Sequence, residues 1–587
     1  MRRLRPALIV LALLAWGTAS AEAASVKPKN GQLAFSAKRG ASRVIYARNS
    51  NGTGLRVIPT QGRADQPSAS PGGLRLAFTR YGEAGAQIWI EYMDGTMLRQ
   101  LTSGPKDTMA DWSAGGDQLV FARGSRGHRN LYTVSAEGGT PRALTFNPAD
   151  DHSPDWAKNG RVAFVRRVGK NDDIYSITQG SSTAKRLTRS PDADLAPSWS
   201  PTGRTLVYVN GKAGHRDLYL LTANGGHRRR LTATPGDEGD PSFSPDGSRV
   251  TFTYTSHGKR TVYFMKVEGS PVKKLPASRN VRARRITTAS SASSFPSWQA
   301  TGLPPVVAAA GDAACSPNDP SFNNGQGQGS FCHQKQSSDL MLRADLTNVL
   351  AIGDLQYERG EYANFLAAFD PSWGRLKPII KPVPGNHEYE TPGASGYFDY
   401  FNGPGVQSGQ AGDRDKGYYS FDIGTWHIEA LNSECNNIGG CGADSPQIQW
   451  LKSDLAAHPA TCTLAYWHRP TFSSGRFNDH GDMKPAWDAL YAGGADLILN
   501  GHDHIYERFG PQTPDGVADP VNGIRQITIG EGGRSQHGIV QPLPNSQFRD
   551  TGTVGVGQLT LRDGAYDWRF LAAVSGVAAD SGSASCH

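Results

Sequence analysis

The chain has 587 residues, which is too many for a single hydrophobic core, so we expect at least two domains. Its charge is divided unevenly. Residues 1–303 carry 43 Lys and Arg against 22 Asp and Glu, whereas residues 304–587 carry 18 against 31. Beyond residue 23 no stretch approaches the roughly 18 apolar residues of a membrane span, which argues against an integral membrane protein.

The first residues have the pattern of an export signal. The segment "MRRLRPALIVLALLAWGTASAEA" combines a basic start, an apolar stretch and small residues spaced as before a cleavage site. This pattern predicts a secretory signal over residues 1–23 that is removed near its end. The mature protein is therefore expected to be secreted or otherwise extracytoplasmic.

All six cysteines lie in the second half of the chain. An even number of cysteines in an exported protein predicts disulfides. The sequence contains no CxxC pair, so cysteine ligands to a metal are the less favoured interpretation. Six cysteines allow 15 pairings. Proximity along the chain favours two short-range bonds and leaves one long-range bond: Cys315–Cys332, Cys435–Cys441 and Cys462–Cys586.

A repeat dominates the first half. Each unit begins with a turn-rich segment. The first five continue with two β-type runs, and the first four end in a motif such as "RQLT" or "KRLT". The starts of the units are separated by 43, 44, 43, 44 and 55 residues. A period near 43 with about four strands per unit is typical of a β-propeller. The opening segments are "PSASPGG" at 67, "ADWSAGG" at 110, "PDWAKNG" at 154, "PSWSPTG" at 197, "PSFSPDG" at 241 and "PSWQATG" at 296.

The two ends of this array complement each other. Residues 30–40 match a unit that lacks its leading strand, and "PSWQATG" at 296 supplies a leading strand alone. If the last strand completes the first blade, six blades close into a ring. Residues 30–300 thus resemble the TolB-type six-bladed propellers, which implies a recognition or scaffold role. The basic runs at 226–231 and 280–285 predict either contact with an anionic wall polymer or solvated loop edges, and no base-stacking platform for a nucleic acid is evident.

The second half repeats a different design. Five apolar runs each end in a glycine or a turn that is followed by a side chain suited to binding metal, and helical patterns lie between several of them. This alternation predicts a layered α/β domain with its site at the carboxyl ends of the strands. The five runs are "PPVVAAAGDAA", "TNVLAIGDLQY", "PIIKPVPGNHE", "CTLAYWHRP" and "ADLILNGHDH".

The last run places two histidines on alternate positions. Residues two apart on an extended segment point to the same side, so His502 and His504 can face one pocket together. An isolated HxH could equally be a polar loop. Five such segments in succession favour a metal site.

Together "GDAA", "GDLQY", "GNHE", "WHRP" and "GHDHIYER" resemble the calcineurin-like metallophosphoesterases and, within them, the purple acid phosphatases. The resemblance covers roughly 304–575 of a domain expected over 304–587, a β-sandwich flanked by helices. It implies two metal ions, Fe(III) and a divalent Zn, Fe or Mn, that share one bridging carboxylate. The first ion would be held by Asp312, Asp354, Tyr357 and His504, and the second by Asp354, Asn386, His468 and His502.

The resemblance also implies the chemistry. Such an ion pair activates a shared water and clamps the phosphate, and His387 would contact the phosphate and protonate the leaving group. Two positions depart from the wider superfamily. Ala314 stands where a histidine ligand is common. Tyr357 can serve as a ligand in place of that histidine. Arg469 stands where a second histidine is common, and it could clamp phosphate but could not act as an acid.

The sequence therefore predicts an exported phosphomonoesterase of acid phosphatase type that acts on a phosphorylated small molecule, with an added propeller for substrate, partner or wall binding. Two alternatives stay open. The same metal site could serve a phosphodiesterase or nucleotidase, because pocket walls and not ligand motifs choose the substrate. In the second alternative, the chain is a binding protein whose propeller binds a protein or an anionic cell-wall polymer, and the metal domain has a secondary role.

Overall fold

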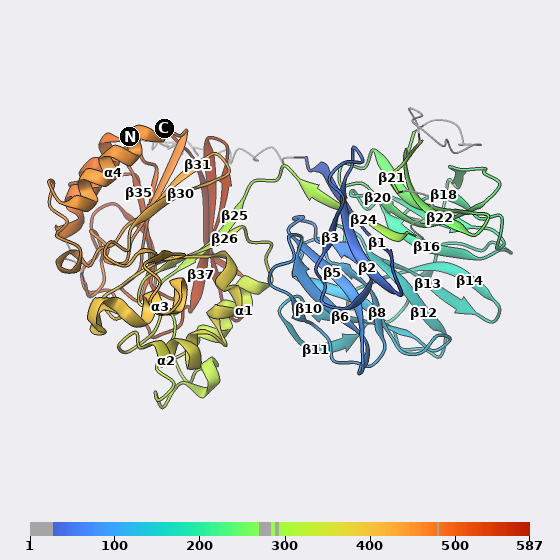
Figure 1. Cartoon of the computed structure of the whole chain (residues 1–587), viewed down its shortest axis with the longest axis horizontal. Coiled ribbons are helices and arrows are strands. Elements are labelled where there is room, and N and C mark those ends of the chain that lie inside the picture. Colours follow the sequence, from blue (N-terminus) through green and yellow to red (C-terminus); the bar gives the residue numbers. More distant parts are fainter. Residues whose placement is uncertain (1–26, 269–282, 288–292, 478–480) are drawn as a thin grey trace, which may run out of the picture.

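The computed structural model describes residues 27–268, 283–287, 293–477 and 481–587. The chain forms two bodies that lie side by side, an all-β body from the first half and an α/β body from the second (Figure 1). The predicted secretory signal at residues 1–23 lies outside the described residues. Within the described ranges no helix is long and apolar enough to cross a membrane.

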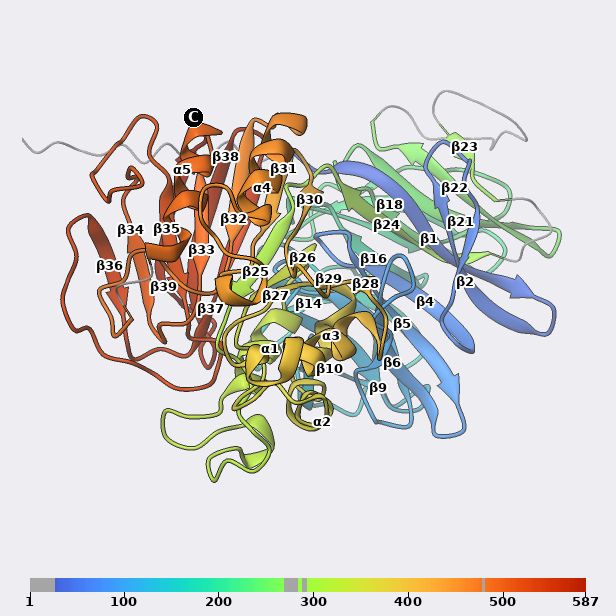
Figure 2. The same ribbon diagram turned by 60° about the vertical axis from the view of Figure 1, so that its left-hand side comes forward.

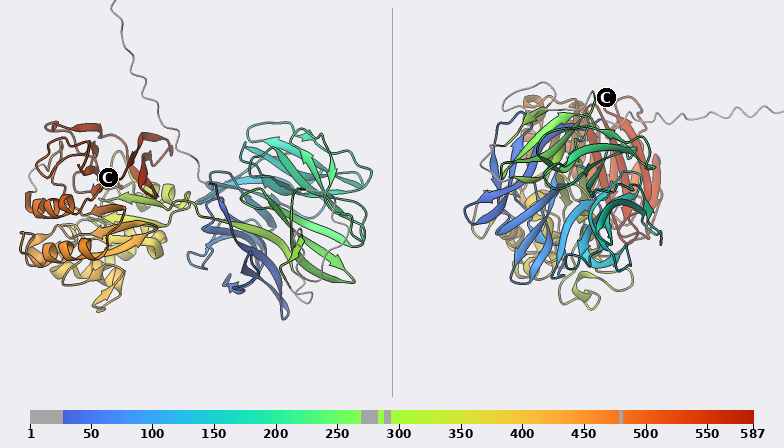
Figure 3. Two further views of the ribbon diagram at one scale, coloured as in Figure 1. Left: turned by 90° about the horizontal axis from the view of Figure 1, so that it is seen from above. Right: turned by 90° about the vertical axis from the view of Figure 1, so that its right-hand side faces the viewer.

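The first body is a ring of six four-stranded antiparallel sheets, seen nearly end-on in the right-hand view of Figure 3. Alternating apolar residues bury one face of each sheet against the next, as between Phe78 and Ile45 of neighbouring blades. From the innermost strand outward, the blades are β24 (Ser294–Thr301), β1 (Lys29–Arg39), β2 (Ser42–Asn49), β3 (Arg56–Ile58); β4 (Arg63–Ala69), β5 (Arg75–Gly82), β6 (Gly85–Tyr92), β7 (Arg99–Gln100); β8 (Asp107–Trp112), β9 (Gln118–Arg123), β10 (Asn130–Ser135), β11 (Gly138–Ala143); β12 (Asp150–Trp156), β13 (Arg161–Val168), β14 (Asn171–Thr178), β15 (Lys185–Arg186); β16 (Asp194–Trp199), β17 (Thr205–Asn210), β18 (Asp217–Thr222), β19 (Arg229–Arg230); and β20 (Asp237–Phe243), β21 (Arg249–Ser256), β22 (Lys259–Lys266), β23 (Ala283–Arg285).

The ring closes as the two ends of the repeat array predict. Strand β24 pairs antiparallel with β1, in a register that places Leu33 opposite Trp298. The last strand of the array thus supplies the innermost strand of the first blade. The prediction of a six-bladed propeller is confirmed, because this pairing joins the last strand of the array to its first blade.

The second body is a two-sheet sandwich. A six-stranded sheet and a seven-stranded sheet pack face to face through residues such as Leu350, Ile428 and Leu464. The first sheet, in spatial order, contains β27 (Ile380–Val383), β26 (Asn348–Ile352), β25 (Val306–Ala310), β37 (Gly555–Arg562), β38 (Ala565–Ala572) and β39 (Ala578–Ser585). The second contains β30 (Tyr419–Ile423), β31 (Trp426–Ala430), β32 (Cys462–Tyr466), β33 (Leu497–Asn500), β35 (Arg525–Ile529), β34 (Tyr506–Phe509) and β36 (Ser546–Asp550).

Helices cover the outer faces of the sandwich, as Figure 2 shows for α4 and α5 beside β31 and β33. Leu451 and Trp487 pack these two helices against the seven-stranded sheet. The α-helices are α1 (Gln334–Leu342), α2 (Tyr362–Asn364), α3 (Ser395–Asn402), α4 (Pro446–Ala457) and α5 (Lys484–Ala492). Short helical turns η1 to η7 and a small hairpin complete the body: Asn323–Gly325, Phe365–Phe369, Trp373–Ile379, Glu388–Glu390, Pro392–Ala394, Cys435–Asn437, Gly481–Met483, β28 (Ser408–Gly409) and β29 (Gly412–Asp413).

All three disulfides form with the pairing that chain proximity favours: Cys315–Cys332, Cys435–Cys441 and Cys462–Cys586. Cys462–Cys586 joins the start of β32 to the residue next to the chain's last, across a sequence separation of 124. The predicted pairing is therefore confirmed, and the long-range bond ties the C-terminal end of the chain to the seven-stranded sheet.

A buried arginine joins the two bodies. Arg75, on β5 of the propeller, pairs with Asp345 of the second body at 2.6 Å and donates to the carbonyl of Leu342, the last residue of α1, at 2.9 Å. Around this pair, Arg343 and Glu137 form a second ion pair between the bodies. Positive charge at a helix C-terminus is favourable because the helix dipole is negative there.

Candidate metal centre

The predicted ligand side chains follow the carboxyl ends of five strands. Strands β25, β26 and β27 run parallel in one sheet, and β32 and β33 run parallel in the other. Because parallel strands end at the same edge, the loops after them can meet there. They carry all of the predicted ligands: Asp312, Asp354, Tyr357, Asn386, His468, His502 and His504.

Three of these residues have left-handed backbone conformations. The φ angles are 59° at Asp312, 48° at Asp354 and 66° at His502. Non-glycine residues rarely adopt such angles, and the resulting strain is concentrated at functional sites. At Gly353, where φ is 73°, a Cβ atom would lie 2.7 Å from the Cβ of His468. The turns before the ligands are therefore too close-packed to accept a larger residue.

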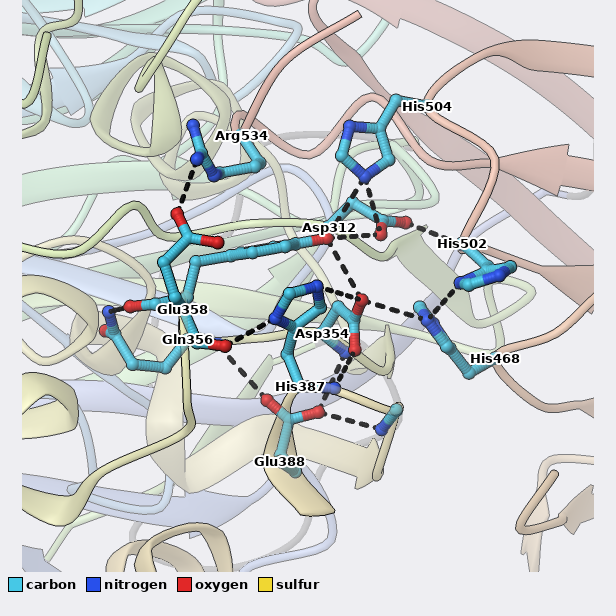
Figure 4. A network of polar contacts seen from close by, with 12 residues as sticks. Asp312, Asp354, Gln356, Glu358, His387, Glu388, His468, His502, His504 and Arg534 are labelled. Carbon is cyan, nitrogen blue, oxygen red and sulfur yellow. Dashed lines mark hydrogen bonds and ion pairs between the residues drawn. The ribbon is translucent and has the colours of Figure 1, made fainter. Parts of the chain in front are cut away.

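One group of donor atoms surrounds the phenol oxygen of Tyr357. This oxygen lies 2.8 Å from Asp312 Oδ1, 3.1 Å from Asp354 Oδ2 and 3.1 Å from His504 Nε2. Nε2 of His504 is in turn 3.2 Å from Asp312 Oδ1. Four donors from three loops thus converge on one volume. Figure 4 shows three of them, Asp312, Asp354 and His504, pointing toward one another.

A second group shares the carboxylate of Asp354. Nε2 of His468 lies 3.1 Å from Asp354 Oδ2 and 3.1 Å from Nδ1 of His502. The same Oδ2 atom contacts Tyr357 in the first group. Asp354 is therefore placed between the two groups, as a bridging ligand must be.

These donors fit a pair of metal ions. Metal bonds of about 2.0–2.2 Å put neighbouring ligand atoms about 3 Å apart, which agrees with the separations of 2.8–3.2 Å around Tyr357 and His504. Oδ1 of Asn386 is buried without a hydrogen-bond partner, which is costly unless the atom binds something else. Phenol and carboxylate oxygens suit a hard trivalent ion, and the imidazoles suit a divalent one.

Outer contacts orient the imidazoles. Nδ1 of His468 is 2.9 Å from the carbonyl of Ile352, and Nδ1 of His504 is 2.6 Å from Oγ of Ser535. These contacts leave Nε2 of both rings facing the cluster. Such partners fix the tautomer and raise ligand basicity in metal sites.

Glu388 holds the loops that carry Asp354 and Asn386. Its buried carboxylate accepts hydrogen bonds from the backbone N–H groups of Asp354, Leu355 and Gly385, each at 2.8 Å. Burial and then the charge of Asp354 raise its pKa to about 7. Glu388 thus lies beneath the ligand loops and fixes their backbone.

The side chains stabilise one another's charge. Burial alone would raise the pKa of Asp354, but the imidazoles of His468 and His387 outweigh it and the pKa falls below the usual range. Burial would lower the pKa of His468, yet Asp354 raises it to about 9. Burial and the neighbouring carboxylates raise the pKa of Tyr357. Asp354 thus stays ionised although it is buried, because neighbouring imidazoles compensate its charge.

The two predicted catalytic residues flank the cluster. Nδ1 of His387 contacts the carbonyl of Glu358, its ring lies 4.2 Å from that of Tyr357, and its Nε2 is 3.8 Å from Asp354 Oδ2. Arg469 pairs with Glu434 at 2.7 Å and reaches Nε2 of His502 at 3.4 Å. The guanidinium is therefore engaged by a carboxylate, and its role as a phosphate clamp stays a prediction.

Sequence reasoning missed the loop after β35. Arg534 in this loop pairs with Glu358 at 2.5 Å and stacks on the ring of Tyr357 at 5.2 Å. His537 stacks on His504 with ring centroids 4.0 Å apart and contacts Asp503 at 3.2 Å. The signal was present, because "QITIGEGGRSQH" repeats the design of an apolar run, a glycine and polar residues.

Comparison with known proteins identifies both bodies. Residues 66–210 and 152–294 match the family model of the TolB beta propeller domain, and residues 339–506 match that of calcineurin-like phosphoesterases. The chain thus contains a TolB-type propeller followed by a calcineurin-like phosphoesterase domain, and both predicted resemblances are confirmed.

The curated relatives include several purple acid phosphatases. The chain is 31% identical over 228 residues to purple acid phosphatase 18 of Arabidopsis thaliana, covering 36% of this chain and 49% of that protein. It is 30% identical over 177 residues to purple acid phosphatase 15 of the same plant (28% and 32%) and 32% identical over 168 residues to human acid phosphatase type 7 (23% and 36%). The matches thus span about a third to a half of the length of these relatives.

Solved structures similar to this chain include proteins of both kinds. A purple acid phosphatase from yellow lupin (Lupinus luteus) seeds aligns at 15% identity with a TM-score of 0.39, covering 95% of this chain and 91% of that one. TolB from Acinetobacter baumannii aligns at 17% identity with a TM-score of 0.39, covering 46% and 66%.

Proposed function

We propose that the second body is a binuclear-metal phosphoesterase that hydrolyses phosphate monoesters, of acid phosphatase type. The observation that carries the proposal is the convergence of side chains from strand ends in both sheets on one carboxylate oxygen, Oδ2 of Asp354. The curated relatives support the same chemistry.

The ligands divide into two sets around Asp354. The donors gathered at Tyr357 would hold Fe(III), and those gathered at His468 would hold a divalent Zn, Fe or Mn. When bound, such an ion pair supplies Lewis-acid polarisation of the phosphate and a water of lowered pKa. The two sets are Asp312, Asp354, Tyr357 and His504, and Asp354, Asn386, His468 and His502.

His387 would handle the proton of the leaving group. Its Nδ1 contacts the carbonyl of Glu358, so Nδ1 carries a hydrogen and Nε2 is the nitrogen that can exchange a proton with the substrate. The ring packs against Tyr357, which fixes its orientation beside the cluster. A positioned acid of this kind contributes about 10²–10⁴-fold to the rate.

The rest of the chain supports an exported enzyme. Three disulfides and no free cysteine among the described residues are typical of an oxidising compartment. The first 303 residues, most of which form the propeller, carry 43 Lys and Arg against 22 Asp and Glu, which would favour an anionic substrate, partner or wall polymer. We therefore propose a secreted phosphatase whose propeller serves binding.

The test is hydrolysis of a chromogenic phosphate monoester and its diester analogue by the full chain loaded with iron and zinc or manganese. Asp354→Asn removes the bridging carboxylate, and Asp563→Asn, on an exposed turn, is the matched control. Tyr357→Phe should abolish visible absorption from a tyrosinate bound to Fe(III). Monoester turnover lost only in Asp354→Asn supports the proposal, whereas a diester preference would replace it with the phosphodiesterase alternative. No turnover with two metals bound would refute it.

A further inference from the structure

A second cluster of metal-binding side chains lies at the opposite end of the seven-stranded sheet from the candidate metal centre. We call it the β31–α4 cluster. His427 lies near the start of β31, where it pairs in register with Thr463 near the start of β32. The ligands of the centre instead follow the ends of β32 and β33. The members of the β31–α4 cluster are His427, Glu429, Asp454 and His458.

The sequence places these four side chains on facing surfaces. His427 and Glu429 are two apart on β31, so they share the face that points away from the sandwich core, whereas Ile428 between them packs inside it. Asp454 and His458 are four apart at the C-terminal end of α4, so they also share one face. The strand face and the helix face meet.

The donor atoms are spaced as around one ion. Nε2 of His427 is 2.8 Å from Asp454 Oδ2 and 3.4 Å from Glu429 Oε1, and Nδ1 of His458 is 3.3 Å from Asp454 Oδ2. Tetrahedral zinc with bonds of about 2.0–2.1 Å separates its ligand atoms by about 3.3 Å. One ligand atom each of His427, Asp454 and His458 also lie within 4.8 Å of one another, so a single ion could contact all three.

Asp422 supplies the outer contact that such sites use. Its Oδ1 lies 2.9 Å from Nδ1 of His427, across the hairpin that pairs β30 with β31. This carboxylate fixes the hydrogen on Nδ1 and directs Nε2 toward Asp454 and Glu429. The arrangement is the carboxylate–histidine pair that orients metal ligands elsewhere.

The buried charge in the cluster calls for a cation. Glu429 is fully buried, and neither of its oxygens has a hydrogen-bond partner. Three carboxylates, those of Glu429, Asp422 and Asp454, lie within 3.4 Å of the ring nitrogens of His427. A buried carboxylate needs a paired charge or a metal. His458 has a half-exposed side chain, which leaves an entry path from solvent.

We propose that the β31–α4 cluster is a third metal site, which takes one Zn²⁺ through His427 Nε2, Glu429, Asp454 and His458 Nδ1. Four protein ligands leave no open position, as is typical of structural and not catalytic zinc. The ion would fasten the C-terminal end of α4 to β31. The sequence signature is "HIE" at 427–429 with "DLAAH" at 454–458.

The test counts zinc in the full chain. The protein is stripped with a chelator, loaded with iron and excess zinc, desalted and analysed by elemental mass spectrometry. The double variant Asp454→Asn/His458→Gln removes both helix ligands, and His128→Gln, at an exposed propeller position, is the control. The wild type and the control should each hold about one zinc more than the double variant. This difference does not depend on whether the candidate metal centre fills.

A second measurement keeps the proposal testable if the double variant folds poorly. Asp422 is mostly exposed, so Asp422→Ala should fold normally. It should weaken the zinc affinity of the cluster by about 10–100-fold, as loss of such an outer carboxylate does elsewhere. Equal zinc content in the wild type and the double variant, or an unchanged affinity in Asp422→Ala, would show that the cluster holds a proton and not a metal.

Discussion

A buried arginine lies at the contact between the two bodies, which makes Arg75→Met an informative substitution. The guanidinium contacts Asp345 at 2.6 Å and donates to the carbonyls of Leu342 at 2.9 Å and Gly116 at 2.6 Å. It also stacks on the ring of Trp112 at 4.7 Å. Methionine keeps most of the volume and removes every charged contact.

The expected cost follows from what remains. Asp345 would keep only its hydrogen bonds from Ser70 Oγ at 2.9 Å and Gly72 N at 2.8 Å, and its charge would lose its buried partner. Breaking a buried ion pair by removing one member costs about 3–5 kcal/mol. Arg75→Met should therefore lower the free energy of unfolding of the docked chain by that amount. Replacing both members, in Arg75→Met/Asp345→Leu, should recover much of it.

Urea unfolding monitored by tryptophan fluorescence measures this change in the free energy of unfolding. The readout is the shift in the midpoint of the first transition, because the two domains need not unfold together. Arg562→Met, which removes the partner of Asp567 on a partly exposed hairpin, is the control and should cost at most about 1 kcal/mol. An equal shift in Arg75→Met and Arg562→Met would refute the reasoning. It would mean that water solvates Asp345 in the docked protein.

Three further outcomes are expected. His387→Asn should lower kcat for the monoester by about 10²–10⁴-fold with unchanged metal content, and a loss of metal in elemental analysis would contradict its role as a proton donor. Cys462→Ala/Cys586→Ala removes a disulfide between residues that are 124 positions apart in the sequence. It should lower the free energy of unfolding, measured by thermal unfolding, by about 2–5 kcal/mol. The raised pKa of His427, about 9 against 6.5, stabilises the metal-free chain fully below pH 6.5, and this contribution is lost as pH rises through 9. Between pH 6.5 and pH 9 the melting temperature of the wild type should therefore fall more than that of His427→Gln. Parallel plots of melting temperature against pH for the two proteins would contradict this role of His427.

The local sequence was sufficient to predict much of the fold. The repeat near 43 residues specified the blades, and the split unit specified their closure through β24 and β1. Chain proximity favoured the correct disulfides because loops of 17 and 6 residues close at little entropic cost, which left Cys462 and Cys586 for each other. These features depend on short-range patterns that are visible without any tertiary contact.

The candidate ligands could be predicted because each follows an apolar strand and because these segments resemble those of a known family. Parallel strands of one sheet end at a common edge, and the face-to-face packing of the two sheets brings both sets of loops together. The β31–α4 cluster has comparable local signals, an HxE on a strand and a DxxxH on a helix. Those signals carry no information about whether the two faces meet. Only the packing of α4 on β31 brings Asp454 within 2.8 Å of His427.

The sequence by itself determined the two domain types, the disulfide pairing and the set of candidate ligands. Tertiary structure alone decided which charged side chains have partners. Arg469 lies against Glu434, Arg534 lies over Tyr357, and Arg75 is buried against Asp345. Long side chains reach across loops and domains, and their partners are chosen by burial and desolvation, which no pattern of neighbouring residues encodes.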